Sequence, residues 1–261
     1  MSRERTYRSE AVVLRRVDFG EADRLLTLYS REHGKIKAIA KGARKPQSRK
    51  TGHVELFMRS RFFIAQGRNL DIITQAEAID PYVALRSDLV RTTYASYAVE
   101  LLDRFTVEED KHVGIYDLLV EALGWFSTSE SLMLAARYYE LRLLALTGFH
   151  PRLFQCVSCS KPIEEQDQFF SLKLGGLLCP DCRHADHNAL PITAVAVKVL
   201  RYLQTRTWDV IRHLHLKPPL RNELEQVMHA YLKYTLERDL KSVVFLNRLR
   251  HEAELFAPSE D

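Results

Sequence analysis

The sequence predicts an α+β chain in which a small closed β-barrel is followed by an α-helical domain that carries an inserted four-cysteine module. Three observations support this fold class. Short β-branched runs dominate the first 80 residues. Apolar residues recur at helical spacing from about residue 82 onward. All four cysteines lie in two CxxC pairs. We therefore expect one domain over residues 1–80 and a second over 81–261, with the cysteine module at about 150–187.

Five short strands are expected in the first domain, separated by turn residues such as Gly20, Gly34 and Gly67. In the third strand Ile36, Ala38 and Ala40 share one face, and lysines occupy the other. The five strands are Ala11–Phe19, Leu25–Tyr29, Lys35–Lys41, Val54–Ala65 and Leu70–Ala78. Five strands with little helix are typical of the OB-fold, although an SH3-like barrel would give nearly the same pattern.

Six helices are expected in the second domain, because apolar residues there recur every three to four positions. Asp88 is a candidate N-cap of the first, Gly148 closes the third, and Pro191 opens the fourth. The predicted helices cover residues 85–105, 112–126, 131–146, 192–204, 218–240 and 243–255.

Charge is distributed unevenly along the chain. The formal net charge is only +4, but residues 1–80 hold 17 Lys and Arg against 10 Asp and Glu, a net of +7. The remaining residues hold 21 and 24, a net of −3. This asymmetry suggests a domain boundary and an anionic partner for the first part.

Residues 33–54 concentrate seven cations and contain no acidic residue. Such a run repels itself unless an anion is present, and alternate lysines on a strand align along one face of a sheet. OB-folds bind single strands in this way and add aromatic stacking platforms. Of the candidate platforms, we expect one or two at most to face a ligand; they are Phe19, Tyr29, Phe57, Phe62 and Phe63. The alternative is a merely soluble surface. The cations are Lys35, Lys37, Lys41, Arg44, Lys45, Arg49 and Lys50.

The cysteines form the pairs Cys156/Cys159 and Cys179/Cys182, with nineteen residues between the pairs. This spacing matches a tetrahedral four-thiolate Zn²⁺ site, which is structural because no coordination position stays open. Two disulfides or a redox CxxC are alternatives, as is replacement of one cysteine by a nearby histidine. The nearby histidines are His150, His184 and His187.

No catalytic constellation is apparent, so we expect a protein that is not an enzyme. Paired carboxylates, a GxSxG elbow, a Walker loop and HExxH are absent. Asp18, Glu21 and Asp23 cluster around Gly20 and raise the alternative of a metal-dependent nuclease. The charged first residues are unlike a signal peptide, and no run of about 18 apolar residues occurs, so we expect a cytoplasmic protein with no membrane span.

Several segments resemble the RecO family of recombination mediators over nearly the full length. GEADRLLTLYS at 20–30 and AKGARKP at 40–46 resemble the N-terminal region of that family. In the middle of the chain GFHPRL at 148–153 leads into the first CxxC, and GGLLC at 175–179 opens the second. The family order of OB-fold, helical domain and zinc module also matches. Some members lack the cysteines, whereas all four are present here.

The resemblance implies a DNA repair and homologous recombination protein that binds single- and double-stranded DNA and anneals complementary strands. Its implied partners are RecR, the C-terminal tail of single-strand-binding protein, in some pathways RecF, and RecA, which is loaded onto the coated strands. It also implies association with the bacterial nucleoid during repair. Arg24 lies in a matching segment and joins the seven cations as a candidate DNA contact.

Two other functions stay open at this point. One is a basic OB-type module that binds RNA or an acidic protein, with structural zinc. The other is a zinc-dependent hydrolase, in which removal and restoration of the metal would control activity directly.

Overall fold

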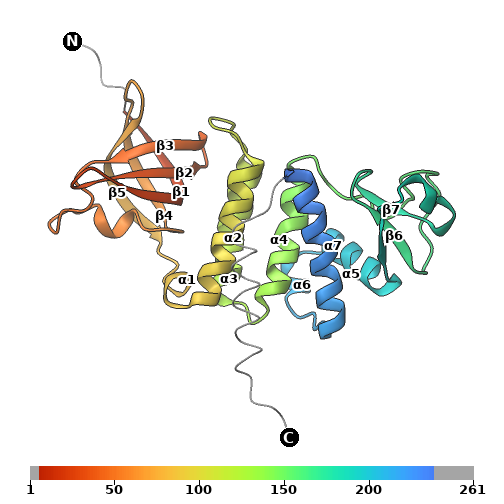
Figure 1. The fold of residues 1–261 in the computed structure, drawn as a ribbon. Coiled ribbons are helices and arrows are strands. Elements are labelled where there is room, and N and C mark those ends of the chain that lie inside the picture. Colours follow the sequence, from red (N-terminus) through yellow and green to blue (C-terminus); the bar gives the residue numbers. More distant parts are fainter. Residues whose placement is uncertain (1–5, 238–261) are drawn as a thin grey trace, which may run out of the picture. The chain divides into compact units, whose positions relative to one another are not determined.

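The computed structural model describes residues 6–237, which divide into two compact units, 6–128 and 129–237 (Figure 1). The first unit contains a closed five-stranded barrel and helices α1 to α3, and the second contains α4 to α7 and a small sheet. No helix among the described residues has the length and apolar character needed to cross a membrane. The fold class predicted from the sequence is confirmed.

The barrel has the strand order β1-β2-β3-β5-β4, and β1 pairs with both β2 and β4 to close it. Neighbouring strands are antiparallel except for β3 and β5, which run parallel. β1 pairs on both edges, and a bulge between Val13 and Arg15 bends it. The strands are β1 (Thr6–Phe19), β2 (Asp23–Ser30), β3 (Gly34–Ala40), β4 (Arg59–Ala65) and β5 (Asp71–Asp80).

The barrel interior is filled by side chains that alternate along each strand. Ile36, Ala38 and Ala40 of β3 are all buried, as their shared face predicts. They pack in a core with Leu26 and Leu28 of β2 and with residues of the other strands. Burial of this apolar face fixes the register of β3, so its odd-numbered lysines must point outward.

A short break divides the first predicted helix into α1 (Ala84–Ser87) and α2 (Leu89–Phe105). The side chain of Asp88 accepts a hydrogen bond from the backbone N–H of Arg91 at 3.0 Å, so this residue caps α2 as predicted. α3 (Val113–Thr128) packs beside α2 and completes the first unit.

In the second unit the predicted helices recur with shifted ends. Gly148, with φ +86°, closes α4 (Leu132–Leu146) as expected. The next helix, α5 (Ala194–Thr205), starts later than predicted, because Thr193 caps it and Pro191 lies in a strand. α6 (Trp208–Ile211) is short, and α7 (Pro218–Leu236) is long. The predicted end of α7 near Leu240 and the predicted helix at 243–255 lie outside the described residues.

A three-stranded sheet of order β7-β6-β8, which was not predicted, supports the cysteine module. Its strands are β6 (Gln168–Ser171), β7 (Gly176–Leu178) and β8 (Leu190–Ile192), and the module also includes the 3₁₀ helix η2 (Pro180–Ala185). Strands of three or four residues are too short to show a period of two in the sequence. The other 3₁₀ helix, η1 (Thr51–His53), lies in the barrel between β3 and β4.

Candidate nucleic-acid interface and metal centre

The loop at 42–50, between β3 and η1, is held against the turn that joins β1 to β2. Gly42 turns the chain with φ +66°, and its N–H donates to the Asp23 carboxylate at 2.7 Å. The N–H of Arg44 donates to the carbonyl of Ala22 at 2.9 Å. These bonds hold the loop in place although it is rich in charged and polar side chains, so its cations extend from a positioned backbone.

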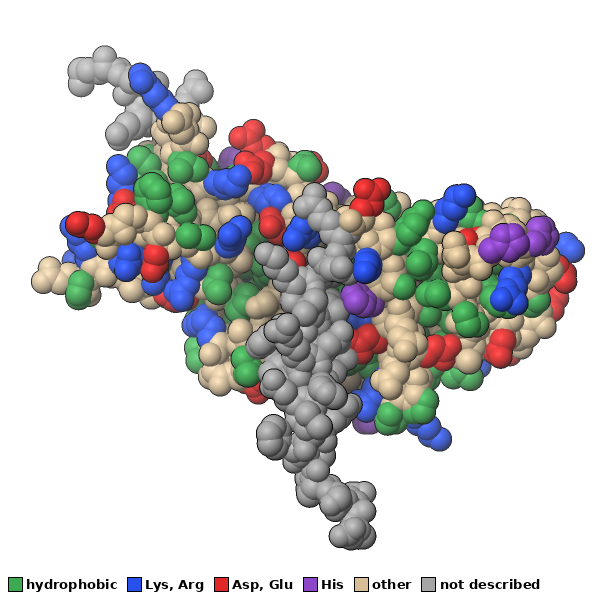
Figure 2. All heavy atoms as spheres, viewed as in Figure 1, with side chains coloured by type: hydrophobic (Ala, Val, Ile, Leu, Met, Phe, Trp, Pro, Cys, Tyr) green, Lys and Arg blue, Asp and Glu red, His purple; other side chains and the backbone are tan. Residues whose placement is uncertain are grey.

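A surface hollow of about 780 Å³ lies between this loop and β5. It brings together three of the predicted DNA contacts: Lys45, Arg49 and Lys50. The Lys50 ammonium donates to the carbonyl of Ile73 at 3.1 Å, and burial lowers its pKa from the ordinary lysine value. Polar side chains of Thr74 and Gln75 line the opposite wall. Figure 2 shows Lys and Arg side chains, in blue, spread over the visible face of the barrel.

The remaining cations of the loop and of the β1–β2 hairpin differ in how far ion pairs and hydrogen bonds within the protein hold them. Lys41 is exposed and makes no ion pair with another described residue. Arg44 is exposed, and its guanidinium donates to the carbonyl of Gly20 at 3.2 Å and lies 3.4 Å from Asp18. Arg24 turns inward, because its guanidinium contacts Asp18 at 3.3 Å and Glu55 at 2.9 Å. Lys41 and Arg44 therefore stand at the surface, whereas Arg24 holds the barrel together.

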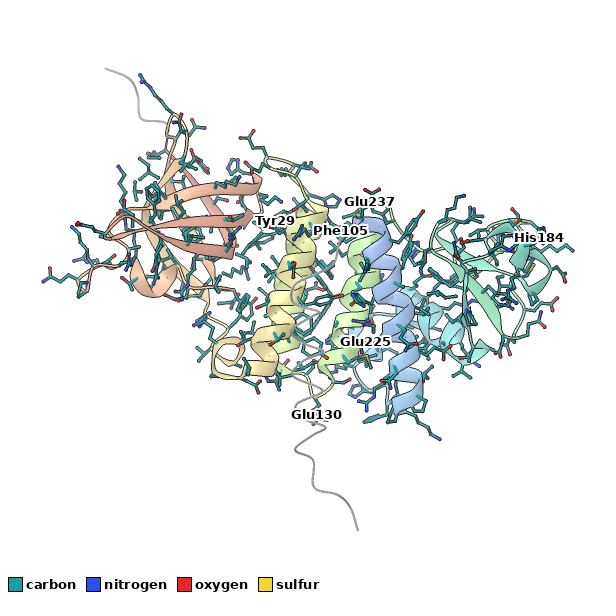
Figure 3. The ribbon with its side chains drawn as sticks, in the orientation of Figure 1. Tyr29, Phe105, Glu130, His184, Glu225 and Glu237 are labelled. Carbon is teal, nitrogen blue, oxygen red and sulfur yellow. The ribbon has the colours of Figure 1, made fainter. Side chains whose placement is uncertain are left out.

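Lys35 is not at the surface, which corrects the expectation that it lies on an open cationic face. It is only 8% exposed, because the C-terminal end of α2 covers this part of β3. Its ammonium donates to the Asp103 carbonyl at 2.7 Å, to the Asp103 carboxylate at 2.9 Å and to the Thr106 carbonyl at 2.7 Å. A cation at a helix C-terminus is favourable, so Lys35 fastens α2 to the barrel. Tyr29 and Phe105 mark this junction in Figure 3.

Lys37 points outward as predicted, but an acidic segment lies beside it. The N–H of Glu109 donates to the carbonyl of Lys35 at 2.9 Å, which aligns residues 108–110 with β3. The Lys37 ammonium then forms an ion pair with the Glu108 carboxylate. Both side chains are 54% exposed, so the pair is screened and open to competition from another anion.

The candidate aromatic platforms separate clearly by burial. Tyr29, Phe57 and Phe62 are at most 2% exposed and belong to the interior. Phe63 is half-buried beneath the Arg8 guanidinium, which lies 4.4 Å from its ring centroid. Phe19 is 51% exposed at the end of β1. Of the five candidate platforms, Phe19 and Phe63 are therefore the two that stay accessible to a ligand, within the expected number of one or two.

Two of the three acidic residues around Gly20 have structural partners, and the third, Glu21, is exposed. Asp18 pairs with Arg24 and Arg44, and Asp23 accepts the N–H of Gly42. Their carboxylates therefore join the β1–β2 turn to the loop. Arg15, an exposed cation of β1, was missed from the sequence because it lies outside the acid-free stretch.

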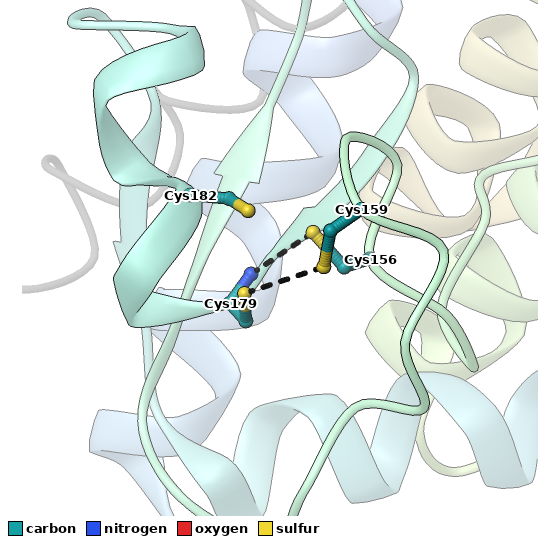
Figure 4. A group of neighbouring side chains, drawn as sticks. All are labelled: Cys156, Cys159, Cys179 and Cys182. Carbon is teal, nitrogen blue, oxygen red and sulfur yellow. Dashed lines mark hydrogen bonds between the residues drawn. The ribbon is translucent and has the colours of Figure 1, made fainter.

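The four cysteine sulfurs converge as their spacing predicts (Figure 4). All four Sγ atoms lie within 4.8 Å of one another, and those of Cys159 and Cys179 are 3.9 Å apart. The first pair sits in a turn closed by the Ser160 N–H, which donates to the Cys156 carbonyl at 2.9 Å. The second pair spans the start of η2, where the Cys182 N–H donates to the Cys179 carbonyl at 2.9 Å.

The chemistry of the four sulfurs fits a divalent metal ion. In a tetrahedral Zn²⁺ site with Zn–S bonds of about 2.3 Å, the sulfurs stand roughly 3.8 Å apart. Burial raises the pKa of the Cys156 thiol, but backbone N–H donors from Cys159 and Cys179 bring it down to about 6. Burial and hydrogen bonding to Cys182 raise the pKa of Cys179 to about 12. A metal cation would let all four ionise together, since it offsets desolvation and mutual repulsion.

The three nearby histidines are not part of this cluster. The only group of potential metal ligands found among residues 6–237 consists of the four cysteines. His184 lies on the exposed side of η2 (Figure 3), and His150 and His187 are also exposed. The cysteines alone therefore supply the ligand set.

Comparison with known proteins matches both parts of the chain to one family. Residues 1–82 match the family model described as "Recombination protein O N terminal", and residues 86–243 match "Recombination protein O C terminal". The chain is 40% identical over 257 residues to a DNA repair protein RecO of Roseiflexus sp. (strain RS-1), covering 98% of this chain and 90% of that protein. It is also 40% identical over 242 residues to the DNA repair protein RecO of Pelotomaculum thermopropionicum, covering 93% and 94%. A DNA repair protein RecO of Dehalococcoides mccartyi (strain 195) is 33% identical over 249 residues, covering 95% and 98%.

Proposed function

The chain belongs to the RecO family of DNA repair and recombination proteins, and on that premise we propose that it binds single- and double-stranded DNA and anneals complementary strands. We further propose that it helps to load RecA onto strands coated by single-strand-binding protein. Annealing requires a protein that holds two phosphate backbones close together and leaves the bases of both strands free to pair. Phosphate contacts through Lys and Arg suit this task because they are independent of sequence.

The observation that carries the proposal is the hollow lined by Lys45, Arg49 and Lys50. Its cations extend from a loop whose backbone is bonded to the β1–β2 turn, so phosphate binding need not first order that backbone. Lys50 sits deeper than its neighbours and has a lowered pKa, which a phosphate anion would restore. The arrangement suits a DNA phosphate backbone that runs across the loop and β5.

The test is annealing of complementary oligonucleotides over a salt series, with and without saturating single-strand-binding protein. Annealing of the coated strands by the full chain is the expected result. The rate should fall as salt rises, since counterion release dominates phosphate binding. Tight, salt-sensitive binding without annealing would contradict the mediator proposal and favour a basic OB-type binding module.

We propose that the protein performs this work without a covalent step. Asp18 and Asp23, two of the three acidic residues around Gly20 that could have formed a nuclease site, are joined to Arg24, Arg44 and the Gly42 N–H. End-labelled single strands and duplexes should therefore be recovered intact after incubation with the protein and Mg²⁺ or Mn²⁺. Time-dependent shortening of either DNA would contradict the proposal.

The proposed protein partners are RecR, RecA, in some pathways RecF, and the C-terminal tail of single-strand-binding protein. A tail with acidic residues and an apolar end requires cations beside apolar side chains. A hollow of about 390 Å³ in the second unit has Arg152 and Lys173 beside Phe149, Leu174 and Tyr234, and Glu237 also lines it. We propose this hollow as the tail site.

A synthetic tail peptide tests this assignment. Lys173→Glu should weaken its binding, whereas Lys161→Glu, an equal charge change outside the hollow, should not. Equal effects of both variants would show a general charge effect and no site at the hollow.

We propose that the ion at the four cysteines is Zn²⁺ and that its role is structural. Four thiolates fill the tetrahedral shell and leave no position for a substrate. Cys159→Ser should lose zinc measured by atomic absorption and lower the thermal stability of the second unit, while binding of short single strands to the barrel persists. Loss of DNA binding with an intact, metal-free fold would contradict the structural role.

We propose that the protein works in the cytoplasm and associates with the nucleoid during repair, because its proposed DNA substrate lies there. Imaging of a fluorescently tagged full chain before and after DNA damage tests this. Recruitment to the nucleoid after damage is expected, and an unchanged distribution would contradict it.

A further inference from the structure

The two segments that lead into the cysteine pairs are hydrogen-bonded to each other. The N–H of Arg152 donates to the carbonyl of Gly175 at 2.9 Å, and the N–H of Leu177 donates to the carbonyl of Arg152 at 2.9 Å. Closer to the cysteines, the N–H of Val157 donates to the carbonyl of Leu177 at 2.8 Å. We call these three backbone bonds the ladder.

The ladder has the sulfur cluster at one end and the proposed tail hollow at the other. Val157 directly follows Cys156, and the second cysteine pair begins two residues after Leu177. At the opposite end, Arg152 and Gly175 line the hollow. One wall of the hollow is therefore built from the same two segments that carry the metal ligands.

Glycines allow this wall to pack closely. A Cβ at Gly176 would lie 2.4 Å from the Arg152 carbonyl oxygen, so no larger residue fits there without a shift of the ladder. A Cβ at Gly175 would lie 3.1 Å from the Tyr231 hydroxyl, which itself donates to the Phe149 carbonyl at 2.9 Å. Because Tyr231 and Phe149 also line the hollow, movement of the β6–β7 hairpin changes its shape.

The hairpin has little to hold it in place apart from the metal centre. Strands β6 and β7 have four and three residues, and ribbons this short are marginal in water. A metal ion that joins Cys156 to Cys179 ties the two segments together beside the ladder and offsets the cost of ordering them. Loss of the ion removes this tie and should loosen the ladder and the wall with it.

Two of the four sulfurs are accessible to a small oxidant. Cys159 is exposed and Cys179 is half-buried, and their Sγ atoms lie 3.9 Å apart. With a peroxide, the Cys159 thiolate attacks one oxygen to form a sulfenic acid, and the O–O bond breaks to release hydroxide. The Cys179 thiolate then attacks that sulfur, forms the disulfide and displaces a second hydroxide. Two electrons pass from the sulfurs to the peroxide.

We propose that the four-thiolate centre is a redox switch for the hollow: oxidation of Cys159 and Cys179 removes two metal ligands, releases the ion and opens the wall. The inference rests on the proposed tail site and adds its regulation. The reduced, metal-loaded protein binds the acidic, apolar-ended peptide, and the oxidised protein releases it. Residues 1–128 contain no cysteine, so DNA binding by the barrel persists in both states.

The test uses the full chain loaded with Zn²⁺, hydrogen peroxide, and a labelled synthetic peptide with the tail sequence of single-strand-binding protein. Peroxide should release zinc to a chromogenic chelator and weaken peptide binding roughly tenfold or more. Hydrogen exchange of residues 171–177 should become faster, because the ladder no longer protects them. Binding of a dT oligonucleotide should not change. Dithiothreitol with Zn²⁺ should restore peptide binding, which assigns the effect to cysteine and not to methionine oxidation.

Reciprocity and a ladder variant give two further readouts. Saturating peptide should raise the affinity for zinc by the same factor by which zinc raises the affinity for peptide, measured by competition with a chelator. Gly176→Ala keeps all four cysteines but disturbs the ladder, so peptide binding should be weak with and without peroxide. Gly124→Ala is the matched control, because a Cβ there would meet nothing within 4 Å beyond its own stretch of helix.

The other outcomes separate this inference from the proposed function. Equal peptide affinity and unchanged hydrogen exchange after zinc release would overturn the switch and leave the tail site in place. Loss of peptide and oligonucleotide binding together would show general unfolding and would also overturn the switch. If the reduced, zinc-loaded protein does not bind the peptide, the tail assignment fails, and the exchange of residues 171–177 still decides whether the metal holds this wall.

Discussion

Strand β3 and the loop that follows it carry the same kind of charge, yet the structure uses their cations differently. Lys35 of β3 is buried against the end of α2, and Lys37 is paired with Glu108. In the loop, Lys45, Arg49 and Lys50 line an open hollow. A cation on a strand has a fixed direction, so a neighbouring element can cover it, whereas the loop cations line a hollow to which no helix of the described chain contributes a residue.

The comparison teaches that a run of positive charge is not one surface. Part of the run stabilises the fold itself. The last carbonyls of α2 lack hydrogen-bond donors within the helix, and the Lys35 ammonium donates to them. The rest is left for an external anion. Four predictions test this division, beginning with the largest expected effect.

The first prediction concerns Lys35. Lys35→Met should destabilise the first unit by about 3 kcal/mol, since it leaves two carbonyls and a carboxylate at the end of α2 without their donor. Urea unfolding followed through Trp125 fluorescence in a Trp208→Phe background measures this. The matched control is Lys41→Met at the exposed residue that directly follows the strand, which should cost no more than about 0.5 kcal/mol. Equal costs at the two positions would end the distinction between strand and loop.

The second prediction concerns the loop. Lys45→Glu/Arg49→Glu should weaken binding of single strands and duplexes alike, by more than tenfold at low salt. It should also reduce the slope of log K against log salt by about 2, one for each lost phosphate contact. Stability should stay within about 0.5 kcal/mol of the wild type because both side chains are exposed. Lys198→Glu/Lys217→Glu, in the second unit, is the charge-matched control; a similar loss there would remove the loop from the site.

The third prediction sharpens the intermediate case of Lys37. Glu108→Gln should strengthen DNA binding about threefold at low salt, because it frees Lys37 from an exposed ion pair. The gain should disappear in Lys37→Met and at high salt. Glu121→Gln, at an exposed position of α3, supplies the control for the change in net charge. Weaker binding in Glu108→Gln would show that the acidic segment supports the site and does not compete with DNA.

The fourth and smallest effect is a pH dependence at Lys50. Burial lowers the pKa of its ammonium, so as pH rises it loses its proton before an ordinary lysine with a pKa of 10.5. DNA affinity should therefore decline about twofold at alkaline pH, below the range where exposed lysines titrate. Lys50→Arg should remove the decline because the guanidinium stays charged. A decline that persists in Lys50→Arg would have another origin.

Local patterns in the sequence were enough to predict the elements and the metal ligands. Each CxxC turn brings its own two sulfurs together, so the fold has only to bring the two turns beside each other to complete the cluster. Asp88 and Gly148 act at helix ends through hydrogen bonds and backbone angles within a few residues. The alternation of apolar and basic residues along β3 also predicted its buried face correctly, because the barrel buries the apolar side.

Contacts distant in sequence decided the rest. Lys35 and its acceptors are 68 and 71 residues apart, so its burial depends on where α2 ends and not on the strand itself. Phe19 and Phe62 look alike in sequence, yet one is exposed at a strand end and the other fills the core. The sequence by itself determined which residue types are available and their local spacing, since these depend on backbone geometry over a few residues. Only the tertiary structure decided which charges and rings reach solvent, because that depends on what the rest of the chain packs against them.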